Sequence, residues 1–309
     1  VVCVELEQEG SLASREARRR RKMKKKAIDT GGERDIGVLL KKHQSALEDL
    51  RILLEDDLAR VEEKHRDMFD GFDDVFMLCY LLSFGKPELA LEPIRKTIAF
   101  KVENESWLGP ASRGEPIEKA PKFESITDFI YAAPFKTEQQ TKDGDNFLFI
   151  IRSGPPSDIK GLMKVVNPED VANFMTYSNE KQYYECRKAT RARQRLTKII
   201  TVNDMTGFGA ASFDMRFARG IGMSSKRGEF LCPQMIDKPV FFNPPGVFAK
   251  IFAVVKPLLS KSLVEKTGLC PCPGGGFEGD IAKCPFASTN LTLATLPVYL
   301  GGEAPDERD

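Results

Sequence analysis

The side chains best suited to metal binding are three cysteines near the end of the chain. Cys270 and Cys272 are separated by one residue, and Cys284 follows them. Zinc sites usually have four nitrogen or sulfur ligands, with cysteine pairs two to four residues apart, whereas the two histidines, His43 and His65, lie far away in the sequence. We therefore expect no metal and interpret the seven cysteines as reduced thiols of a cytosolic protein. A zinc site is the less favoured alternative.

Catalytic and nucleotide-binding patterns are weak in this sequence. The Thr206–Gly209 segment has two glycines but lacks the third of a dinucleotide-binding fingerprint, and no G-x-x-x-x-G-K-[ST] motif occurs. Asp204 ends a predicted strand, where α/β enzymes often place catalytic groups, but a hydrogen bond to the turn at Gly207 is the simpler interpretation. We therefore expect no enzymatic activity and no cofactor. A Rossmann-like enzyme centred on Asp204 is the least favoured alternative.

Composition and charge exclude some classes of protein. The 309 residues are 41% hydrophobic and 29% charged, with a formal net charge of +1. A near-neutral chain is atypical of proteins built around nucleic acid, and no apolar run approaches the roughly 18 residues of a membrane-spanning helix. The acidic first residues do not resemble a secretory signal peptide, and a start at Val1 rather than methionine suggests a fragment. We expect a cytoplasmic protein.

One segment departs strongly from this balance of charge. From Arg15 to Lys26 the chain has nine lysines and arginines and one glutamate. Such runs are usually solvated, but they also serve as nuclear-import signals or as patches for anionic lipid or RNA. We favour a solvated segment and expect no nucleic-acid partner. A nucleic-acid-associated protein that uses this run is an alternative function.

The apolar residues predict helices first, and an alternation of strands and helices afterwards. Helical spacing predicts helices over 36–66, 73–82 and 88–100, and the Gly- and Pro-rich segment 110–121 is typical of a linker. Beyond it, short apolar runs predict strands over 147–151, 196–205, 238–243 and 267–269. Helices over 167–195, from 210 onward and over 246–263 separate them. Strands separated by helices of this length indicate a parallel or mixed α/β sheet.

The predicted helix over 246–263 has a wider apolar surface than a surface helix needs. Its apolar residues occur in adjacent pairs at helical spacing, namely Val247/Phe248, Ile251/Phe252, Val254/Val255 and Leu258/Leu259. Pro257 lacks a backbone N–H, so we expect a kink or a helix end there. A broad apolar helix is compatible with plain core packing. It also suits a lid over a hydrophobic cavity, because one face must then contact lipid chains.

Six motifs in a fixed order resemble the CRAL-TRIO lipid-binding domain. The family pattern has an opening Asp-Gly, a strand-ending Asp-Leu-x-Gly, Tyr-Pro-Glu, Asn-x-Pro-x-x-Phe, Lys-Pro-Phe-Leu followed by Thr-x-x-Lys, and Leu-Pro-x-x-x-Gly-Gly. The matching residues here are Asp143–Gly144, Asp204–Gly207, Cys232–Gln234, Asn243–Phe248, Lys256–Leu259 with Lys266, and Leu296–Gly302. Asp73-Asp74 resembles the start of the family's small N-terminal helical domain.

The resemblance implies the fold class and a division of the chain. It implies an α/β fold in which a mixed, mostly parallel sheet floors an apolar cavity with a gating helix, preceded by a small all-α N-terminal domain. The expected parts are a basic, flexible or helical extension (1–34), the N-terminal helical domain (35–109), a linker (110–122), the CRAL-TRIO domain (123–303) and a tail (304–309).

The resemblance also implies a function. Family members bind or transfer one hydrophobic molecule, such as a phospholipid, tocopherol or a retinoid. We therefore expect a cytoplasmic, peripherally membrane-associated protein that binds a lipid ligand and transfers or presents it during transient contact with a membrane surface, an anionic one included. The expected gate and pocket residues are Val247, Phe248, Ile251, Phe252, Val255, Leu258 and Leu259. The alternative is a degenerate CRAL-TRIO interaction or scaffold module whose pocket is filled by side chains.

The positions that hold the headgroup in phosphatidylinositol-transferring members differ here. In those members an Arg, the Glu of Tyr-Pro-Glu, and the Thr and Lys of Thr-x-x-Lys contact the inositol phosphate. The matching residues are Phe84, Gln234, Leu263 and Lys266, so only the lysine is retained. Each lost charged hydrogen bond would cost about 1.5–3 kcal/mol, and we expect no phosphatidylinositol in the usual pose.

A basic stripe offers another anionic contact. Its residues, Arg187, Arg191, Arg195 and Lys198, follow one face of the predicted helix over 167–195 and continue just beyond its end. We favour a solvated helix face over an anion-binding surface.

Overall fold

The computed structural model describes residues 28, 30, 32–132, 135–270, 290–300 and 302–305, and only the backbone at 269 and 270. The basic run at 15–26, Cys272 and Cys284 lie outside these residues, so the predictions about them stay predictions. Within the described ranges, no group of three or more His, Cys, Asp or Glu residues is placed to hold a metal ion. None of the helices described is both long and apolar enough to cross a membrane.

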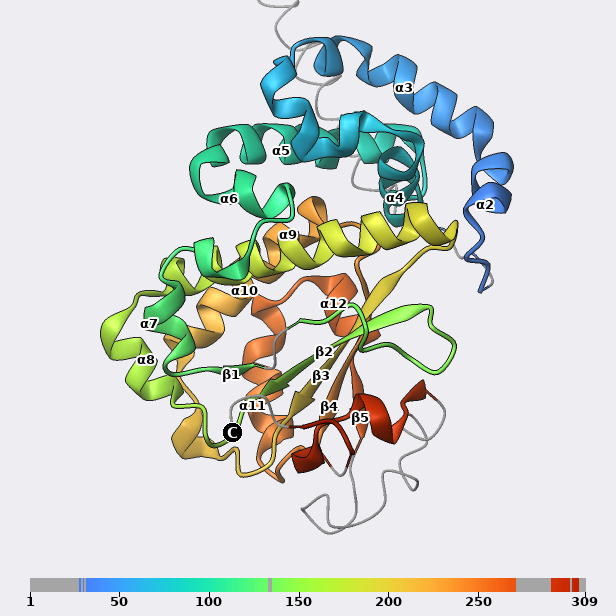
Figure 1. Cartoon of the computed structure of the whole chain (residues 1–309). Helices are drawn as coiled ribbons and strands as arrows, with labels where there is room; N and C mark the ends of the chain where they lie inside the picture. The colour runs from blue at the N-terminus through green and yellow to red at the C-terminus, as the bar shows by residue number, and fades with distance from the viewer. Residues whose placement is uncertain are drawn as a thin grey trace, which may run out of the picture.

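The N-terminal part of the described chain is helical, and Figure 1 shows it as a layer above the long helix α9. The aspartate Asp73 caps α4 by accepting a hydrogen bond from the Phe76 N–H, and Gly85, with a φ of 84°, ends it. Helix α4 is buried on nearly every side and forms the centre of this layer. The elements are α2 (Ile36–Lys42), α3 (Gln44–Ala59), η1 (Glu63–Phe72), α4 (Asp74–Phe84), α5 (Pro87–Glu103) and α6 (Glu105–Ser112).

Two boundaries differ from the sequence-based expectation. The single helix predicted over 36–66 is divided at His43, which ends α2 and precedes α3, and α3 ends at Ala59. The segment predicted as a linker is partly helical, because α6 continues through Pro110 to Ser112. It is followed by η2 (Ile117–Lys119) and α7 (Phe123–Thr127). Glycine and proline content alone therefore placed the break too early.

The sheet is mixed and mostly parallel, which confirms the predicted fold class. Its strand order is β1-β2-β3-β4-β5, with β1 antiparallel to β2 and the other neighbours parallel. The strands are β1 (Tyr131–Ala132), β2 (Asn146–Arg152), β3 (Lys198–Asp204), β4 (Ile236–Phe242) and β5 (Gly268–Cys270). Helices α8 (Ile159–Val165) and α9 (Pro168–Arg193) connect β2 to β3. The 3-10 turn η3 (Ala210–Ser212) and helix α10 (Met215–Leu231) connect β3 to β4.

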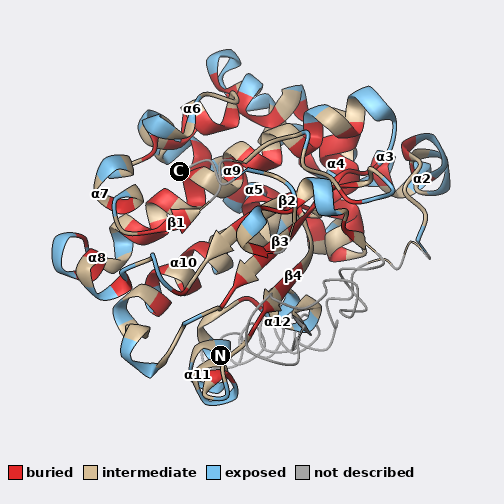
Figure 2. Ribbon diagram, turned by 60° about the horizontal axis from the view of Figure 1, so that its bottom comes forward, coloured by how far each residue is buried: buried red, intermediate tan, exposed pale blue. Residues whose placement is uncertain are grey.

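Each face of the sheet belongs to a different apolar core. Successive side chains of a strand point to opposite faces, so Phe147 and Ile199 pack with residues of α8, α9 and α10. Their neighbours Leu148 and Ile200 pack with Leu291, Leu296 and Leu300 of the C-terminal segment. Figure 2 shows the central strands largely buried and α11 at the edge of the molecule.

The predicted helix over 246–263 is three short elements. They are α11 (Phe248–Val255), the 3-10 turn η4 (Lys256–Leu258) and α12 (Lys261–Lys266). The helix end expected at Pro257 is confirmed, since this proline lies in η4 directly after α11. The side chain of Ser260 then accepts a hydrogen bond from the Leu263 N–H and starts α12.

A buried ion network joins the N-terminal helices to α9. The Lys101 Nζ lies 2.6 Å from Glu180 Oε1, and Arg187 Nη1 lies 3.5 Å from the same oxygen. Ser112 Oγ donates a third contact to Glu180, at 3.1 Å. Burial lowers the pKa of Lys101, yet every cation here has a carboxylate nearby, since Arg187 Nε also lies 2.5 Å from Asp70 Oδ2.

The three arginines of the basic stripe are paired with carboxylates of this chain. Arg187 is buried in the network just described. Arg191 forms two hydrogen bonds with Asp73, at 2.7 and 3.0 Å, and Arg195 lies 2.7 Å from Asp145. The solvated face that the sequence favoured holds for Arg195, whose side chain is 50% exposed, but not for the buried Arg187. Helical spacing shows which residues share a face but not which carboxylates cover it.

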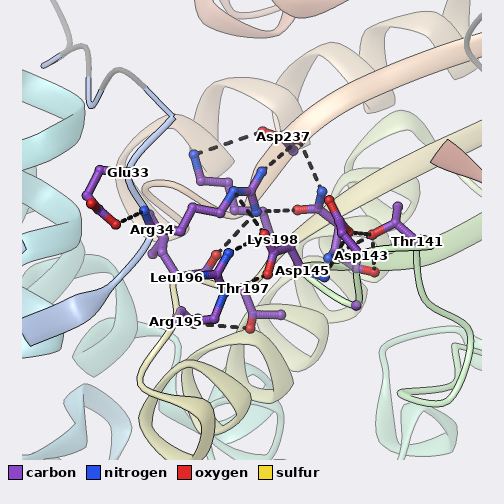
Figure 3. Close-up of polar contacts among 12 residues, drawn as sticks. Glu33, Arg34, Thr141, Asp143, Asp145, Arg195, Leu196, Thr197, Lys198 and Asp237 are labelled. Atoms are coloured by element: carbon purple, nitrogen blue, oxygen red, sulfur yellow. Dashed lines mark hydrogen bonds and ion pairs between the residues drawn. The ribbon is translucent and has the colours of Figure 1, made fainter. Parts of the chain in front are cut away.

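A second polar cluster fixes residues 33–36 against the starts of the strands (Figure 3). The Arg34 guanidinium donates to Asn146 Oδ1 at 2.8 Å and to Asp237 Oδ2 at 3.2 Å. The Leu196 N–H donates to the Arg34 carbonyl at 2.8 Å. Lys198 lies 4.0 Å from Asp237, and its burial lowers its pKa to about 8. The segment that precedes α2 is thereby tied to β2, β3 and β4.

The buried network predicts that Glu180→Gln destabilises the protein strongly. Removing this charge takes away the carboxylate that pairs with the buried Lys101 and leaves Arg187 with Asp70, so we expect a loss of about 3–5 kcal/mol in the free energy of unfolding. Glu92→Gln is the control, because Glu92 forms an exposed i,i+4 pair with Lys96 on α5 and should cost less than about 1 kcal/mol. Urea denaturation measures both. Equal losses in the two variants would contradict the structural role of the network.

Candidate functional site

A cavity of about 1090 Å³ lies between the sheet and the helices α10, α11 and α12. It is slightly larger than the roughly 300–1,000 Å³ of ordinary small-molecule sites. Most of its wall is apolar, and its floor is formed by alternate residues of three neighbouring strands, namely Ile151, Thr201, Asn203, Pro239 and Phe241. The alternative of a scaffold module predicted a pocket filled by side chains, whereas this cavity is open.

Helix α11 forms the outer wall of the cavity. Five of the seven predicted gate and pocket residues line it, namely Phe248, Ile251, Phe252, Val255 and Leu259. The two phenylalanines among them form an aromatic cluster with Phe241 of the sheet. The ring centroid of Phe248 lies 5.1 Å from that of Phe241 and 5.5 Å from that of Phe252. That these residues act as a gate stays a prediction.

The other two predicted residues lie outside the lining. Val247 occupies the N-cap position of α11. Leu258 is in η4 and packs against Gly222 of α10 rather than facing the cavity. Periodicity placed Leu258 on the apolar face of one continuous helix, but the helix ends before it, and the chain direction changes.

The four positions that correspond to headgroup contacts all line the cavity. Phe84 is buried and stacks on Tyr80, with ring centroids 6.2 Å apart. The Gln234 side-chain amide donates to Ser83 Oγ at 3.0 Å. Lys266 Nζ donates to the Ile236 carbonyl at 2.6 Å, which ties α12 to β4, and burial lowers the pKa of this lysine. The structure thus brings the four together, with two of their polar groups already hydrogen-bonded within the protein.

Polar residues between α9, α10 and α12 form a part of the site that the sequence did not indicate. Asn179 Nδ2 donates to Ser224 Oγ at 3.3 Å, and the Ser260 N–H donates to Ser225 Oγ at 3.0 Å. All four residues line the cavity. Single serines on a helix have no distinctive pattern, so only their packing identifies them.

The rim of the cavity is formed by α12. Three of its residues are exposed and also line the cavity, namely Lys261, Ser262 and Glu265. Lys261 and Glu265 form an i,i+4 ion pair at 3.5 Å, and both side chains are largely solvated. The cavity therefore meets solvent beside charges of both signs.

The carboxylate of Asp204 is bonded to the turn that follows β3 and lies near Arg152. Its Oδ1 accepts hydrogen bonds from the Thr206 N–H at 3.0 Å and from the Thr206 hydroxyl at 2.6 Å. Its Oδ2 lies 3.5 Å from Arg152 Nε, and its neighbours Val202 and Phe242 belong to the core on the face opposite α9 and α10. The interpretation of a turn-capping aspartate is confirmed, with Thr206 as the donor.

Comparison with known proteins agrees with the motifs. The model of the CRAL/TRIO domain matches residues 141–271, which contain β2 to β5, α9, α10, α11 and α12. A crystal structure of Sfh5 overlaps 86% of this chain and 93% of its own, with a TM-score of 0.46 and 11% sequence identity. None of the curated proteins compared with the chain matches it. The match assigns residues 141–271, which supply most of the cavity lining, to the CRAL/TRIO domain family.

Proposed function

We propose that this protein binds one lipid molecule in the cavity and carries it between membranes or presents it at a membrane surface. The observation that carries the proposal is a large apolar cavity whose outer wall is a single short helix, α11. The proposal places the protein in the cytoplasm, in transient contact with membranes, as a carrier without catalytic activity.

The physical basis is the cost of moving an acyl chain through water. Each CH2 group exposed to water costs about 0.8 kcal/mol, so a chain of about 16 carbons costs roughly 12 kcal/mol. An apolar cavity offers the chain surroundings similar to those in a bilayer. Extraction is then close to neutral in free energy, provided that the wall opens at the membrane.

Helix α11 is suited to that contact. It contains eight residues, and its outer side includes Val254, which is 50% exposed, and the exposed Ala253. From residue 246 to residue 260 the chain has no acidic residue, and its charges are Lys250 and Lys256. An apolar helix with flanking lysines can enter the interface of a neutral or anionic membrane without burying a carboxylate.

The headgroup positions favour a lipid without a phosphorylated sugar. Phe84 and Leu263 offer no donor to a phosphate, and the Lys266 ammonium is already bonded to the Ile236 carbonyl. The Lys261 and Glu265 pair at the rim presents both signs of charge. We therefore propose a zwitterionic or uncharged lipid as the ligand.

We expect Phe252→Asp to lose the ligand, because a carboxylate would replace an aromatic ring in the apolar wall. Lipid that copurifies with the protein, measured by native mass spectrometry, should fall about tenfold or more, and vesicle-to-vesicle transfer should fall with it. Val165→Asp is the control, since Val165 of α8 is exposed and does not line the cavity, and this variant should keep its bound lipid. A wild-type protein that neither carries lipid nor transfers it would overturn the proposed function.

The ligand class predicts a preference in transfer assays. From donor vesicles that contain equal amounts of labelled phosphatidylcholine and phosphatidylinositol, phosphatidylcholine should be transferred faster, by about tenfold for each charged hydrogen bond that the site fails to offer. Restoring one donor with Leu263→Thr should narrow the difference. Faster transfer of phosphatidylinositol by the wild type would refute the assignment of the headgroup.

A further inference from the structure

We name residues 248–260, which contain α11 and η4 and end at the N-cap of α12, the gate segment. The end of this segment rests directly on a glycine of α10. A Cβ atom added at Gly222 would lie 2.8 Å from the Cβ of Leu258 and 2.9 Å from the Leu258 carbonyl oxygen. Distances below about 3 Å are sterically forbidden for carbon, and one of the two atoms is backbone, which cannot rotate away. The turn η4 thus occupies the space that any side chain at position 222 would need.

A hydrogen bond one helical turn away holds the same segment. Ser225 follows Gly222 by three residues and so shares its face of α10. Its Oγ accepts the Ser260 N–H at 3.0 Å, and the Ser260 hydroxyl in turn caps α12. We name Gly222 and Ser225 the gate seat, since together they contact Leu258 and Ser260 at the end of the gate segment.

The other end of α11 is held by different contacts. Phe248 is buried and packs against Phe241 of the sheet. Residues 249–259, which lie between Phe248 and Ser260 in the chain, are half-buried or exposed. Because η4 begins at Lys256, directly after α11, we expect a displacement of Leu258 from Gly222 to carry the last turn of α11 with it.

Glycine at this position has a cost that calls for an explanation. A glycine inside a helix is less favourable than alanine by roughly 1 kcal/mol. For Gly220, two residues earlier, the neighbouring helix explains it, because a Cβ there would lie 2.8 Å from the Pro168 carbonyl oxygen of α9. For Gly222, the close neighbour is Leu258 of the gate segment.

We propose that the gate seat fixes the closed position of α11 and thereby sets how long the ligand is retained. The inference rests on the proposed function, because it assigns to α10 the contact that the gate must break before a lipid can leave. Opening at this end separates Leu258 from Gly222 and breaks the hydrogen bond between the Ser260 N–H and Ser225 Oγ. The contact of Phe248 with Phe241 of the sheet persists and serves as the pivot.

The test is the rate at which the protein releases a bound lipid. Wild type and variants are loaded with a fluorescent phosphatidylcholine, and release is followed after addition of excess unlabelled phosphatidylcholine vesicles. Gly222→Ala should release the probe about three- to tenfold faster, and Ser225→Ala, which removes only the acceptor, should act in the same direction with a smaller effect. A Gly222→Ala protein that unfolds cooperatively but retains no probe supports the inference equally.

Gly220→Ala is the matched control. It adds the same methyl group to the same helix, but its clash is with α9 and not with the gate segment. Its melting temperature should fall while its release rate stays within about twofold of wild type, a difference worth less than half a kcal/mol.

Two results would overturn the inference. One is a release rate in both Gly222→Ala and Ser225→Ala that equals that of the wild type. The other is equal acceleration by Gly220→Ala, which would show that any disturbance of α10 suffices. A wild-type protein that cannot be loaded with the probe would instead overturn the proposed function.

Discussion

The cavity exists because the two faces of one mostly parallel sheet are covered in different ways. A parallel sheet must bury both faces. On one face, Leu148, Ile200 and Val240 pack tightly against the C-terminal segment. On the other, α8, α9 and α10 cover part of the strands, and the rest, including Thr201 and Phe241, faces an open volume. Helix α11 forms the outer wall of that volume and α12 forms its rim. The proposed role of α11 depends on this incomplete cover of the sheet.

The position of the N-terminal helices matters for the same cavity. They supply Ser83 and Phe84 to its wall, next to Gln234. Two polar clusters keep them in place, namely the buried pairs around Glu180 and the contacts of Arg34 with the strand starts. Buried ion pairs contribute little to stability on their own, but they are costly to break. They therefore suit a junction that keeps one geometry, as the proposed opening of α11 requires.

Helix α11, the proposed gate, is bounded by prolines on both sides. Pro244 and Pro245 precede α11, and Pro257 follows it. Eight residues are too few for a helix that is stable by itself, so its position depends on tertiary contacts at Phe248 and at Leu258. We expect such a segment to change position without unfolding the sheet, because the side chains of Phe248 and Phe252 make its contacts with Phe241 of the sheet.

The sequence alone determined the type and order of most elements. The predicted strand over 147–151 and the helix over 167–195 agree closely with β2 and α9, since the apolar periodicity and the Asn167 cap are local signals. The motifs identified the family, and the proline chemistry located the break at Pro257. These features depend on a few neighbouring residues, so they can be recognised without the fold.

Only the tertiary structure decided which surfaces meet. Arg187 and Arg191 looked solvated by spacing, but Asp70 and Asp73 of a distant segment neutralise them. The headgroup positions come from elements up to 182 residues apart, Phe84 and Lys266 among them, and the fold brings them to one wall. Gly222 carries no signal in the sequence, because its significance is the absence of a side chain where Leu258 lies. Contacts of this kind are set by packing between distant segments, which local periodicity does not encode.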